Sequence, residues 1–352
     1  MTAAAEMKIS PIKILLQEYG ENDGWCNGLK ILPHFDEAML IMLIGARRIG
    51  KTDLFLRLAC DLWIRFHLKT MWVRNKLTEL KEPSFFNDFL NDAKDNGWCP
   101  DTWTVRPDGV HPDEDKGSDA VIKFQSISTF SNRRGGAHPD VIMIVFDEMM
   151  PEDRRYPHMC AEGLLSITKT VFSGNTNARC FCLSNYVSAA NPYFVKLRVY
   201  PAKDKDVTVF RDKAVLIERC RGYRCAIMED NPWNRVYKAA GIGNYADEEE
   251  DELIKLIKAP PKGARPQPYL IQSDGLLYRG WEKNGLIYYA EYRGDTKDIH
   301  IWTPNLKECS DKVKLIIPFM KKDIELNMQT GSLRFKNPNV MFVILNMVFE
   351  TV

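Results

Sequence analysis

The octapeptide GARRIGKT, residues 45–52, lies between an apolar run at 38–44 and a helical repeat that begins at Leu54. It consists of Gly45, Ala46, Arg47, Arg48, Ile49, Gly50, Lys51 and Thr52. Its glycines let the backbone turn so that successive N–H groups face phosphate oxygens at the N-terminus of a helix. Lys51 would reach the β- and γ-phosphates, and Thr52 would offer its hydroxyl to Mg²⁺. Because strand, loop and helix follow in order, a nucleotide-binding P-loop is favoured over a chance match.

A second apolar run, PDVIMIVFDE at 139–148, ends in two acids. After a P-loop, this pattern is typical of a Walker B strand, in which Asp147 holds Mg²⁺ and Glu148 orients or deprotonates the attacking water. The alternative is that the acids only cap the next helix. A glutamate directly after the aspartate favours water as the nucleophile, so the pattern predicts ATP hydrolysis rather than a kinase.

A third apolar run, residues 178–185, ends in Ser184 and Asn185. In ATPases whose catalytic strand lies between the P-loop strand and a sensor strand, this place senses the γ-phosphate. Asn185 is the first candidate for that role and Ser184 shares it, although an ordinary asparagine turn would give the same pattern.

Several cations fall on predicted loops near these strands. The polar segment 75–83 carries Lys76 and Lys81, and Arg154 and Arg155 follow the Walker B acids. We expect these side chains to track a phosphate backbone without reading bases, while a solvated loop is the alternative. The formal net charge of +1 argues neither for nor against nucleic acid.

A length of 352 residues predicts two domains. We place a P-loop ATPase domain at 1–226, a helical linker at 227–258 and a second domain at 259–352. The segment 97–119 has the composition of an insertion or hairpin. In the second domain the short alternating segments predict an antiparallel meander, followed by one or more closing helices from about Asn337. These segments are 269–276, 277–281, 286–292 and 300–302.

The nine cysteines form no C-x₂-C pair, so we expect reduced thiols in a cytosolic protein and no zinc. The longest apolar stretch is shorter than the about 18 residues that span a bilayer, so no membrane contact is predicted.

Taken together, GARRIGKT, VFDE and CFCLSNYVSAANPYF resemble the genome-packaging ATPases of small, protein-primed podoviruses of the phi twenty-nine type. The resemblance extends to MWVRNKLTEL and to GSLRFKNPNV. It implies an α/β chain with an ASCE-type ATPase domain and a small, vestigial RNase H-like C-terminal domain. It also implies a ring, usually pentameric, that is transiently attached through a packaging RNA to the portal of a prohead in the host cytoplasm.

The chain departs from this family's pattern at the residue that acts in trans. The family's arginine after T-V-F is replaced by Ser173. Arg134, thirteen positions before Asp147, falls where the family has another basic trans-acting residue and is the first choice, followed by Lys169 and Arg154. Lys76 lies one position from the family's DNA-gripping lysine.

The function predicted on this basis is ATP hydrolysis coupled to translocation of double-stranded DNA. The alternative is a nucleotide-dependent switch or clamp that binds nucleic acid without translocation. Asp274 lies beside a glycine turn, but no set of carboxylates on successive strands would bind two metals, so nuclease activity is predicted to be absent.

Overall fold

The computed structural model describes most of the chain, and it divides into two compact units. The first consists of Met1–Val187 and Pro201–Glu249, and the second of Ser188–Tyr200 and Glu250–Val352. The described residues are 9–20, 24–81, 83–112, 119–130, 138, 140–151, 155–173, 175–187, 191–202, 204–224, 249–250 and 255–349. Within these ranges, no helix has the length and apolar character that crossing a membrane requires.

The first unit is built on a nine-stranded sheet in the order β3-β4-β5-β2-β6-β7-β1-β10-β9. Its strands are β1 (Leu40–Ile44), β2 (Lys69–Arg74), β3 (Thr104–Arg106), β4 (Gly109–His111), β5 (Ile122–Ser126), β6 (Val141–Phe146), β7 (Arg179–Ser184), β9 (Val207–Phe210) and β10 (Val215–Arg219). The six strands from β5 to β10 are parallel, and antiparallel strands close both edges. Every residue of β1, β2, β6 and β7 is buried, which is why these strands read as continuous apolar runs.

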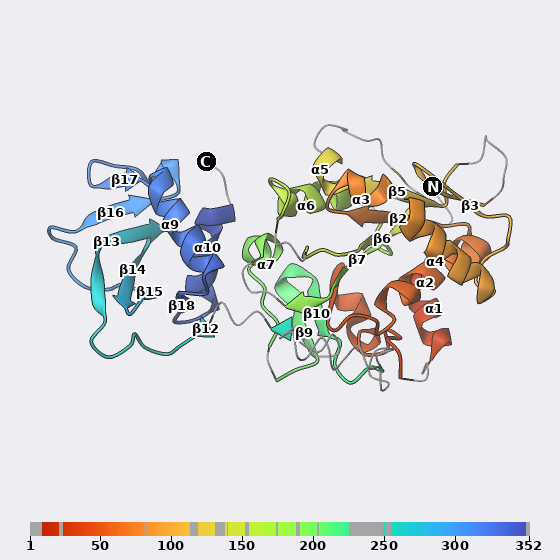
Figure 1. Ribbon diagram of the computed structural model, residues 1–352, viewed down its shortest axis with the longest axis horizontal. Helices are drawn as coiled ribbons and strands as arrows, with labels where there is room; N and C mark the ends of the chain where they lie inside the picture. The colour runs from red at the N-terminus through yellow and green to blue at the C-terminus, as the bar shows by residue number, and fades with distance from the viewer. Residues whose placement is uncertain are drawn as a thin grey trace. The chain divides into compact units, whose positions relative to one another are not determined.

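Helices lie on both sides of this sheet (Figure 1). Helices α1 (Pro11–Tyr19), α2 (Lys51–Phe66) and α4 (Pro83–Asp95) contribute to one hydrophobic core with the sheet. Helices α3 (Leu77–Lys81), α5 (Ile127–Phe130) and α6 (Cys160–Val171) lie together, with α5 and α6 away from α1 and α2. The sheet therefore has helices on both faces, as a buried parallel sheet requires.

The strand order corrects one expectation. The catalytic strand β6 does not lie between the P-loop strand and the sensor strand. Instead the sensor strand β7 lies between β1 and β6 and pairs with both. The strand that carries Ser184 is thus hydrogen-bonded to the strand that leads into the P-loop.

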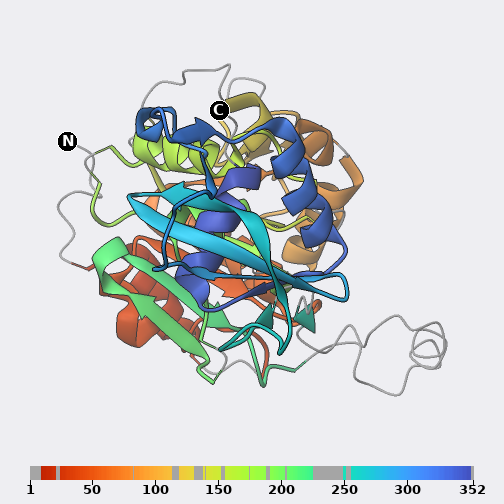
Figure 2. The same ribbon diagram turned by 90° about the vertical axis from the view of Figure 1, so that its left-hand side faces the viewer.

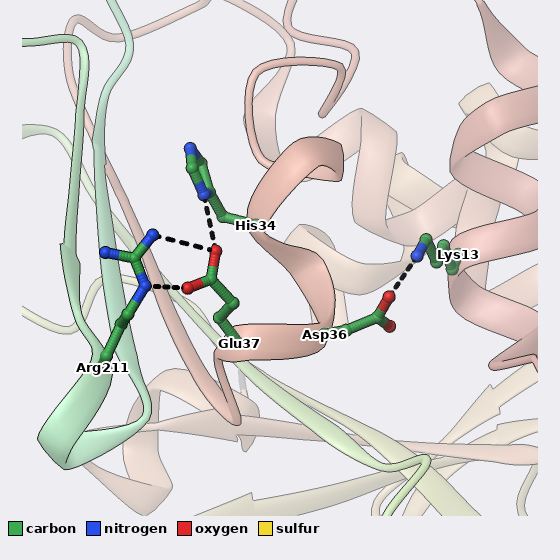
Figure 3. A network of polar contacts seen from close by, with 5 residues as sticks. All are labelled: Lys13, His34, Asp36, Glu37 and Arg211. Carbon is green, nitrogen blue, oxygen red and sulfur yellow. Dashed lines mark hydrogen bonds and ion pairs between the residues drawn. The ribbon is translucent and has the colours of Figure 1, made fainter.

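Polar contacts tie the segment before β1 to its neighbours (Figure 3). Glu37, in the 3₁₀ helix Leu32–Glu37, accepts hydrogen bonds from Arg211, which follows β9, and lies 2.9 Å from His34. These two partners hold the pKa of Glu37 below its usual value. Lys13 of α1 pairs with Asp36 in the same turn. The entry to β1 is therefore linked both to α1 and to the β9 edge of the sheet.

Two loop predictions have different outcomes. Within 97–119 the described residues include the predicted hairpin, formed by β3 and β4. The polar loop predicted at 75–83 is wrong, because its larger part is helix α3 and α4 begins at Pro83. Leu80 is buried, so an apolar contact, which composition does not reveal, supports this helical turn.

The second unit contains a seven-stranded sheet in the order β12-β18-β15-β14-β13-β16-β17 (Figure 2). Its strands are β12 (Lys255–Leu256), β13 (Arg265–Ser273), β14 (Leu276–Lys283), β15 (Leu286–Glu291), β16 (His300–Thr303), β17 (Val313–Leu315) and β18 (Leu333–Phe335). Only β13, β14 and β15 form the predicted antiparallel meander; β16 and β17 add in parallel beside β13, and β18 and β12 beside β15. The sheet is mixed because connections containing helix α9 (Pro318–Gln329) and other segments bring strands back in parallel.

One core joins the helices of this unit to its sheet. It contains residues of α9, of α10 (Pro338–Phe349) and of β13, β14, β15 and β18. Val195 of α7 (Pro192–Leu197) also belongs to it. The closing helix predicted from about Asn337 is α10, whereas α9 was not predicted. Residues 188–200, which we placed in the ATPase domain, belong to the second unit.

Most of the helical linker predicted at 227–258 lies outside the described residues. Its described parts contain two short strands and no helix: β11 (Glu249–Glu250), which forms a two-stranded sheet with β8 (Tyr186–Val187), and β12. The helical prediction is therefore wrong for these residues, since strand pairing with distant segments outweighs local acidic periodicity.

Candidate functional site

The loop at 45–52 is held against the end of β10 and against the N-terminal segment. A Cβ atom added to Gly45 would lie 2.8 Å from Cβ of Cys220, so only glycine fits there. Gly50 has φ of 85° and precedes α2, a conformation that favours glycine. The N–H of Cys26 donates to the carbonyl of Ile49 at 2.9 Å. Both glycines of the motif are thus required by the geometry of the loop.

Lys51, the first residue of α2, folds back into the loop. Its ammonium donates to the carbonyl oxygens of Gly45 at 2.9 Å and Ala46 at 2.6 Å, and the residue is buried. Thr52 and Arg47 are half-buried, and Arg48 is exposed with φ of 55°. A buried ammonium inside a loop of backbone amides is a site for an anion such as a phosphate.

The two predicted acids follow β6 directly. Asp147 is buried, and its N–H donates to the carbonyl of Val73 on β2 at 3.0 Å. Glu148 has φ of 53°, a left-handed conformation that is uncommon for a non-glycine residue. Asn75 stabilises this turn by donating from its amide to the carbonyl oxygens of Glu148 at 2.8 Å and Met149 at 3.3 Å.

Arg74, the last residue of β2, pairs with both acids. Its guanidinium lies 2.7 Å from a carboxylate oxygen of Asp147 and, through its other terminal nitrogen, 2.7 Å from one of Glu148. Sequence reasoning missed Arg74 and Asn75. The available signal was a charged residue at the end of an otherwise apolar strand, TMWVR, but its partners depend on β2 pairing with β6.

Burial raises the pKa of Glu148, and the neighbouring carboxylate of Asp147 adds to this, while Arg74 lowers it. The side chain of Glu148 still has 45% of its surface exposed, whereas that of Asp147 has 7%. A carboxylate with a raised pKa that also reaches solvent is suited to accept a proton from water.

The predicted sensor residues meet the P-loop at its base. Ser184 is buried, and its carbonyl accepts a hydrogen bond from the N–H of Gly45 at 3.1 Å. Asn185 is half-buried at the same end of β7. The N–H of Met149 donates to the carbonyl of Leu183 at 2.9 Å, so the sensor strand also contacts the turn after the acids. The structure thus gathers the P-loop, both acids and the sensor strand at the carboxyl ends of neighbouring strands.

The cationic candidates are distributed differently. Lys76 directly follows Arg74 and Asn75 and is half-buried, and Lys81 ends α3. Arg155 is exposed. Arg134 and Arg154 lie outside the described residues. Lys169 in α6 and Ser173 after it are exposed.

The donor set at the site fits a magnesium ion. The hydroxyl of Thr52 and the carboxylate of Asp147 are oxygen ligands of the kind Mg²⁺ prefers. The carboxylate of Asp147 is also buried, and the guanidinium of Arg74 lies 2.7 Å from it. This position therefore already accommodates a positive charge.

Asp274 of the second unit lies in the turn between β13 and β14. Its carboxylate is 2.9 Å from the guanidinium of Arg198, and its N–H donates to Glu308 at 2.7 Å. Both side chains of the Arg198 pair are largely exposed. Among the described residues, no group of three or more His, Cys, Asp or Glu side chains is arranged to hold a metal ion.

The chain matches known proteins most clearly over the first unit. The family model described as podovirus DNA encapsidation protein (Gp16) matches residues 25–226, more than half of the chain. The DNA packaging protein of Bacillus phage phi29 is 29% identical over 184 residues, which cover 51% of this chain and 53% of that protein. That of Bacillus phage B103 is 29% identical over 196 residues, or 52% and 54%. The chain therefore spans about half the length of these relatives.

Two solved structures share the fold of nearly the whole chain. The structure described as the Phi-28 gp11 DNA packaging motor has a TM-score of 0.70 at 15% identity and covers 94% of this chain and 99% of its own. The phi29 viral genome packaging motor assembly has a TM-score of 0.61 at 23% identity, covering 92% and 99%. These likenesses extend the common architecture to the second unit.

Proposed function

Because this chain belongs to the podovirus DNA encapsidation protein (Gp16) family, we propose that it is an ATP-driven motor that moves double-stranded viral DNA into a prohead. The observation that carries the proposal is the gathering of Lys51, Asp147 and Glu148 at one end of the sheet, within the matched residues. In the proposed reaction ATP is the substrate and water the nucleophile.

Each group of the site has a role in this reaction. Lys51 exchanges its two carbonyl partners for phosphate oxygens, and the amides of residues 45–50 bind the same phosphates. Glu148 orients the water and accepts its proton as oxygen attacks the γ-phosphorus. Ser184 and Asn185 contact the γ-phosphate from the sensor strand. Mg²⁺, when bound, is held by Thr52 and Asp147 and neutralises charge on the phosphates.

A neighbouring subunit supplies the remaining cation. Ser173 is not a cation, so Arg134 is the first candidate and Lys169 and Arg154 follow. The proposed assembly is a homo-oligomeric ring, because a cation given in trans makes hydrolysis depend on subunit contact. The resemblance to the phage packaging ATPases makes a pentamer the expected ring size. Such a residue is worth about 10³ to 10⁵ in rate in related nucleotide hydrolases.

The DNA contacts are proposed on the same end of the sheet. Lys76, Lys81, Arg154 and Arg155 follow the strands that carry the site, so nucleotide-driven movement there reaches the phosphate backbone of DNA. Phosphate contacts weaken steeply with salt. The proposed partners at the prohead are the portal and a packaging RNA, and the place of action is the host cytoplasm.

The second unit is proposed to be an RNase H-like domain without nuclease activity. The pairing of the Asp274 carboxylate with Arg198 is compatible with this proposal, because a two-metal nuclease would need several carboxylates placed around its metal ions. We retain the ASCE-type ATPase domain at 1–226, the linker at 227–258 and the C-terminal domain at 259–352 as proposed functional divisions, with residues 188–200 packing in the second unit.

The test is steady-state ATPase activity with and without proheads and double-stranded DNA. Wild type, Glu148→Gln and Arg134→Ala are compared, with Glu325→Gln of α9 as a matched control. The proposal predicts strong stimulation that Glu148→Gln abolishes and that Arg134→Ala loses while ATP still binds. Activity that ignores prohead and DNA would contradict the motor and favour the ATP-dependent switch or clamp.

A further inference from the structure

Two cysteines of the first unit come together from separate segments of the chain. Cys60 lies on α2, and Cys99 lies in the loop that follows α4. Both belong to the hydrophobic core of this unit, in which α2 packs against α4. Their thiols share a hydrogen bond in which Cys60 donates to the sulfur of Cys99. The mechanism above uses neither residue.

The turn after α4 directs Cys99 back towards α2. Gly97 has φ of 69°, and its N–H donates to the carbonyl of Lys94 at 2.8 Å. The N–H of Trp98 donates to the carbonyl of Ala93 at 2.8 Å. These two hydrogen bonds form a Schellman turn, which ends a helix and changes the direction of the chain. The next residue, Cys99, is buried in the core that contains Cys60.

The two thiols differ in access and in proton affinity. Cys60 is fully buried, whereas Cys99 is 7% exposed and is followed by the exposed residues Pro100 and Asp101. The hydrogen bond from Cys60 lowers the pKa of Cys99 against the effect of burial, and the ammonium of Lys94 lowers it further. The same hydrogen bond and burial raise the pKa of Cys60. A thiolate near the surface beside a second thiol is the arrangement that reacts with oxidants in redox-sensing proteins.

A second thiol pair in the same unit lacks this access. The sulfur atoms of Cys180 and Cys182 are 4.0 Å apart on β7. Every residue of β7 is buried, and the strand pairs with β1 on one side and β6 on the other. An oxidant would have to pass through the core to reach this pair. Proximity of two sulfur atoms alone therefore does not make a reactive site.

We propose that Cys60 and Cys99 form a redox-modification site that reacts with a hydroperoxide and closes to a disulfide. The thiolate of Cys99 attacks one oxygen of the peroxide, the O–O bond breaks, and Cys99 becomes a sulfenic acid. The other oxygen takes a proton and leaves as an alcohol, or as water when the oxidant is hydrogen peroxide. The sulfur of Cys60 then attacks the sulfenic sulfur, forming the S–S bond, and its proton leaves with the hydroxyl group as water.

Closure of the disulfide would act on the helix that carries the phosphate-binding lysine. An S–S bond is about 2.05 Å long, shorter than a hydrogen-bonded sulfur contact, so the loop of Cys99 must move towards α2. Trp98, the preceding residue, lines a cavity beside Gly50, and α2 begins at Lys51. We expect the oxidised protein to hydrolyse ATP more slowly than the reduced protein. This effect on hydrolysis rests on the proposed function, whereas disulfide formation does not.

The experiment counts thiols in the full-length protein. Reduced protein is treated with a stoichiometric amount of hydrogen peroxide, quenched with catalase, unfolded and titrated with a chromogenic thiol reagent. Wild type is compared with Cys60→Ser and Cys99→Ser, and Cys309→Ser, which removes a cysteine of the second unit, is the matched control. Peptide mapping of the unreduced protein identifies the cysteines that are joined, and ATPase activity is measured before and after oxidation.

Wild type should lose two of its nine thiols, and dithiothreitol should restore both. Cys309→Ser should also lose two. Cys60→Ser should stop at a sulfenic acid on Cys99, which a 1,3-dione traps, and Cys99→Ser should lose no thiol. Oxidation should lower the ATPase rate of wild type and Cys309→Ser reversibly, and it should leave the rate of Cys99→Ser unchanged.

The thiol site would be overturned by an unchanged thiol count in wild type, by a disulfide mapped to other cysteines, or by an equal thiol loss in Cys99→Ser. The mapping uses wild type, so it decides the question even if a serine variant does not fold. A mapped disulfide between Cys60 and Cys99 with an unchanged ATPase rate would overturn the effect on hydrolysis. Reduced protein without any ATPase activity would contradict the proposed function and leave the thiol site standing.

Discussion

Each unit contains an arginine–aspartate pair at the end of a strand or a turn, and the two pairs differ in their access to water. Arg74 and Asp147 in the first unit are 2.7 Å apart and have 6% and 7% of their side chains exposed. Arg198 and Asp274 in the second are 2.9 Å apart, and each is 61% exposed. The distances are nearly equal, so distance does not distinguish the pairs.

Burial gives the two pairs different consequences. Water screens the exposed pair and solvates either partner when the other is removed. In the buried pair, each charge depends on its partner, because an isolated charge is costly in a low-dielectric interior. In the first unit, the buried carboxylate of Asp147 therefore requires a cation beside it. A Mg²⁺ ion bound with ATP would be such a cation. Four measurements test this contrast.

The largest effect is expected on catalysis. Glu148→Gln should lower the ATPase rate by about 10² to 10⁴, because the amide cannot accept a proton from water. Asp274→Asn, which removes the acid of the second unit, should leave the rate unchanged. Steady-state hydrolysis measures both. A comparable loss in the two variants would mean that the acids of the units are not functionally different.

The next effect is on stability. Arg74→Met should lower the free energy of unfolding of the first unit by about 3 to 5 kcal/mol, the usual cost of leaving a buried charge without its partner. Urea titrations in EDTA measure it. Addition of Mg²⁺ should recover part of the loss in this variant, since a cation can again compensate Asp147. A loss below about 1 kcal/mol would show that the pair behaves as if exposed.

Glu218 on β10 is a buried acid that belongs to neither of the arginine pairs compared above. It is fully buried, and it accepts a hydrogen bond from the Tyr223 hydroxyl at 2.8 Å. Burial raises its pKa. The folded state thus binds its proton more tightly, and wild type loses stability as pH rises from the unfolded pKa, near 4.5, through the raised value. Glu218→Gln should therefore gain stability relative to wild type as pH increases.

The readout for Glu218→Gln is the difference in thermal midpoint between the variant and wild type at pH 5 and at pH 8. A difference that is the same at both values would mean that Glu218 does not titrate with folding. Glu282→Gln, at an exposed position of β14 in the second unit, serves as the control that removes a carboxylate from the protein surface.

The smallest effect is expected for the exposed pair. Arg198→Met should change the free energy of unfolding by only about 0 to 1 kcal/mol, and salt should reduce even that. The same urea titration, performed at low and high ionic strength, measures it. A loss as large as that of Arg74→Met would overturn the view that solvent access separates the two pairs.

The sequence was sufficient for features that are local. Strand, glycine loop and helix at 38–66 follow from apolar runs and from the φ that Gly50 requires, and the acids after β6 follow from their position beside a buried strand. Residues 75–83 were mispredicted because the helix α3 depends on burial of Leu80 rather than on composition. Helix α9 was missed because only two of its residues, Met320 and Ile324, are buried, so its sequence shows little helical apolar periodicity.

Features that depend on strand order were beyond reach. Arg74 meets Asp147 and Glu148 only because β2 pairs with β6, and Ser184 meets Gly45 only because β7 lies between β1 and β6. Neither of these strand pairings can be predicted from a local sequence pattern. The assignments of Arg134 and Arg154 remain predictions, because both residues lie outside the described part of the chain.

The place of α7 bears on how this protein can be divided for experiments. The chain leaves the first unit after Val187, contributes Asn191 as the cap of α7 and Val195 to the second core, and returns at Pro201. A fragment that stops at residue 226 would keep this segment but lose the core around it, exposing apolar side chains to solvent. Expression of the ATPase unit alone should therefore favour aggregation unless residues 188–200 are replaced by a short polar connection.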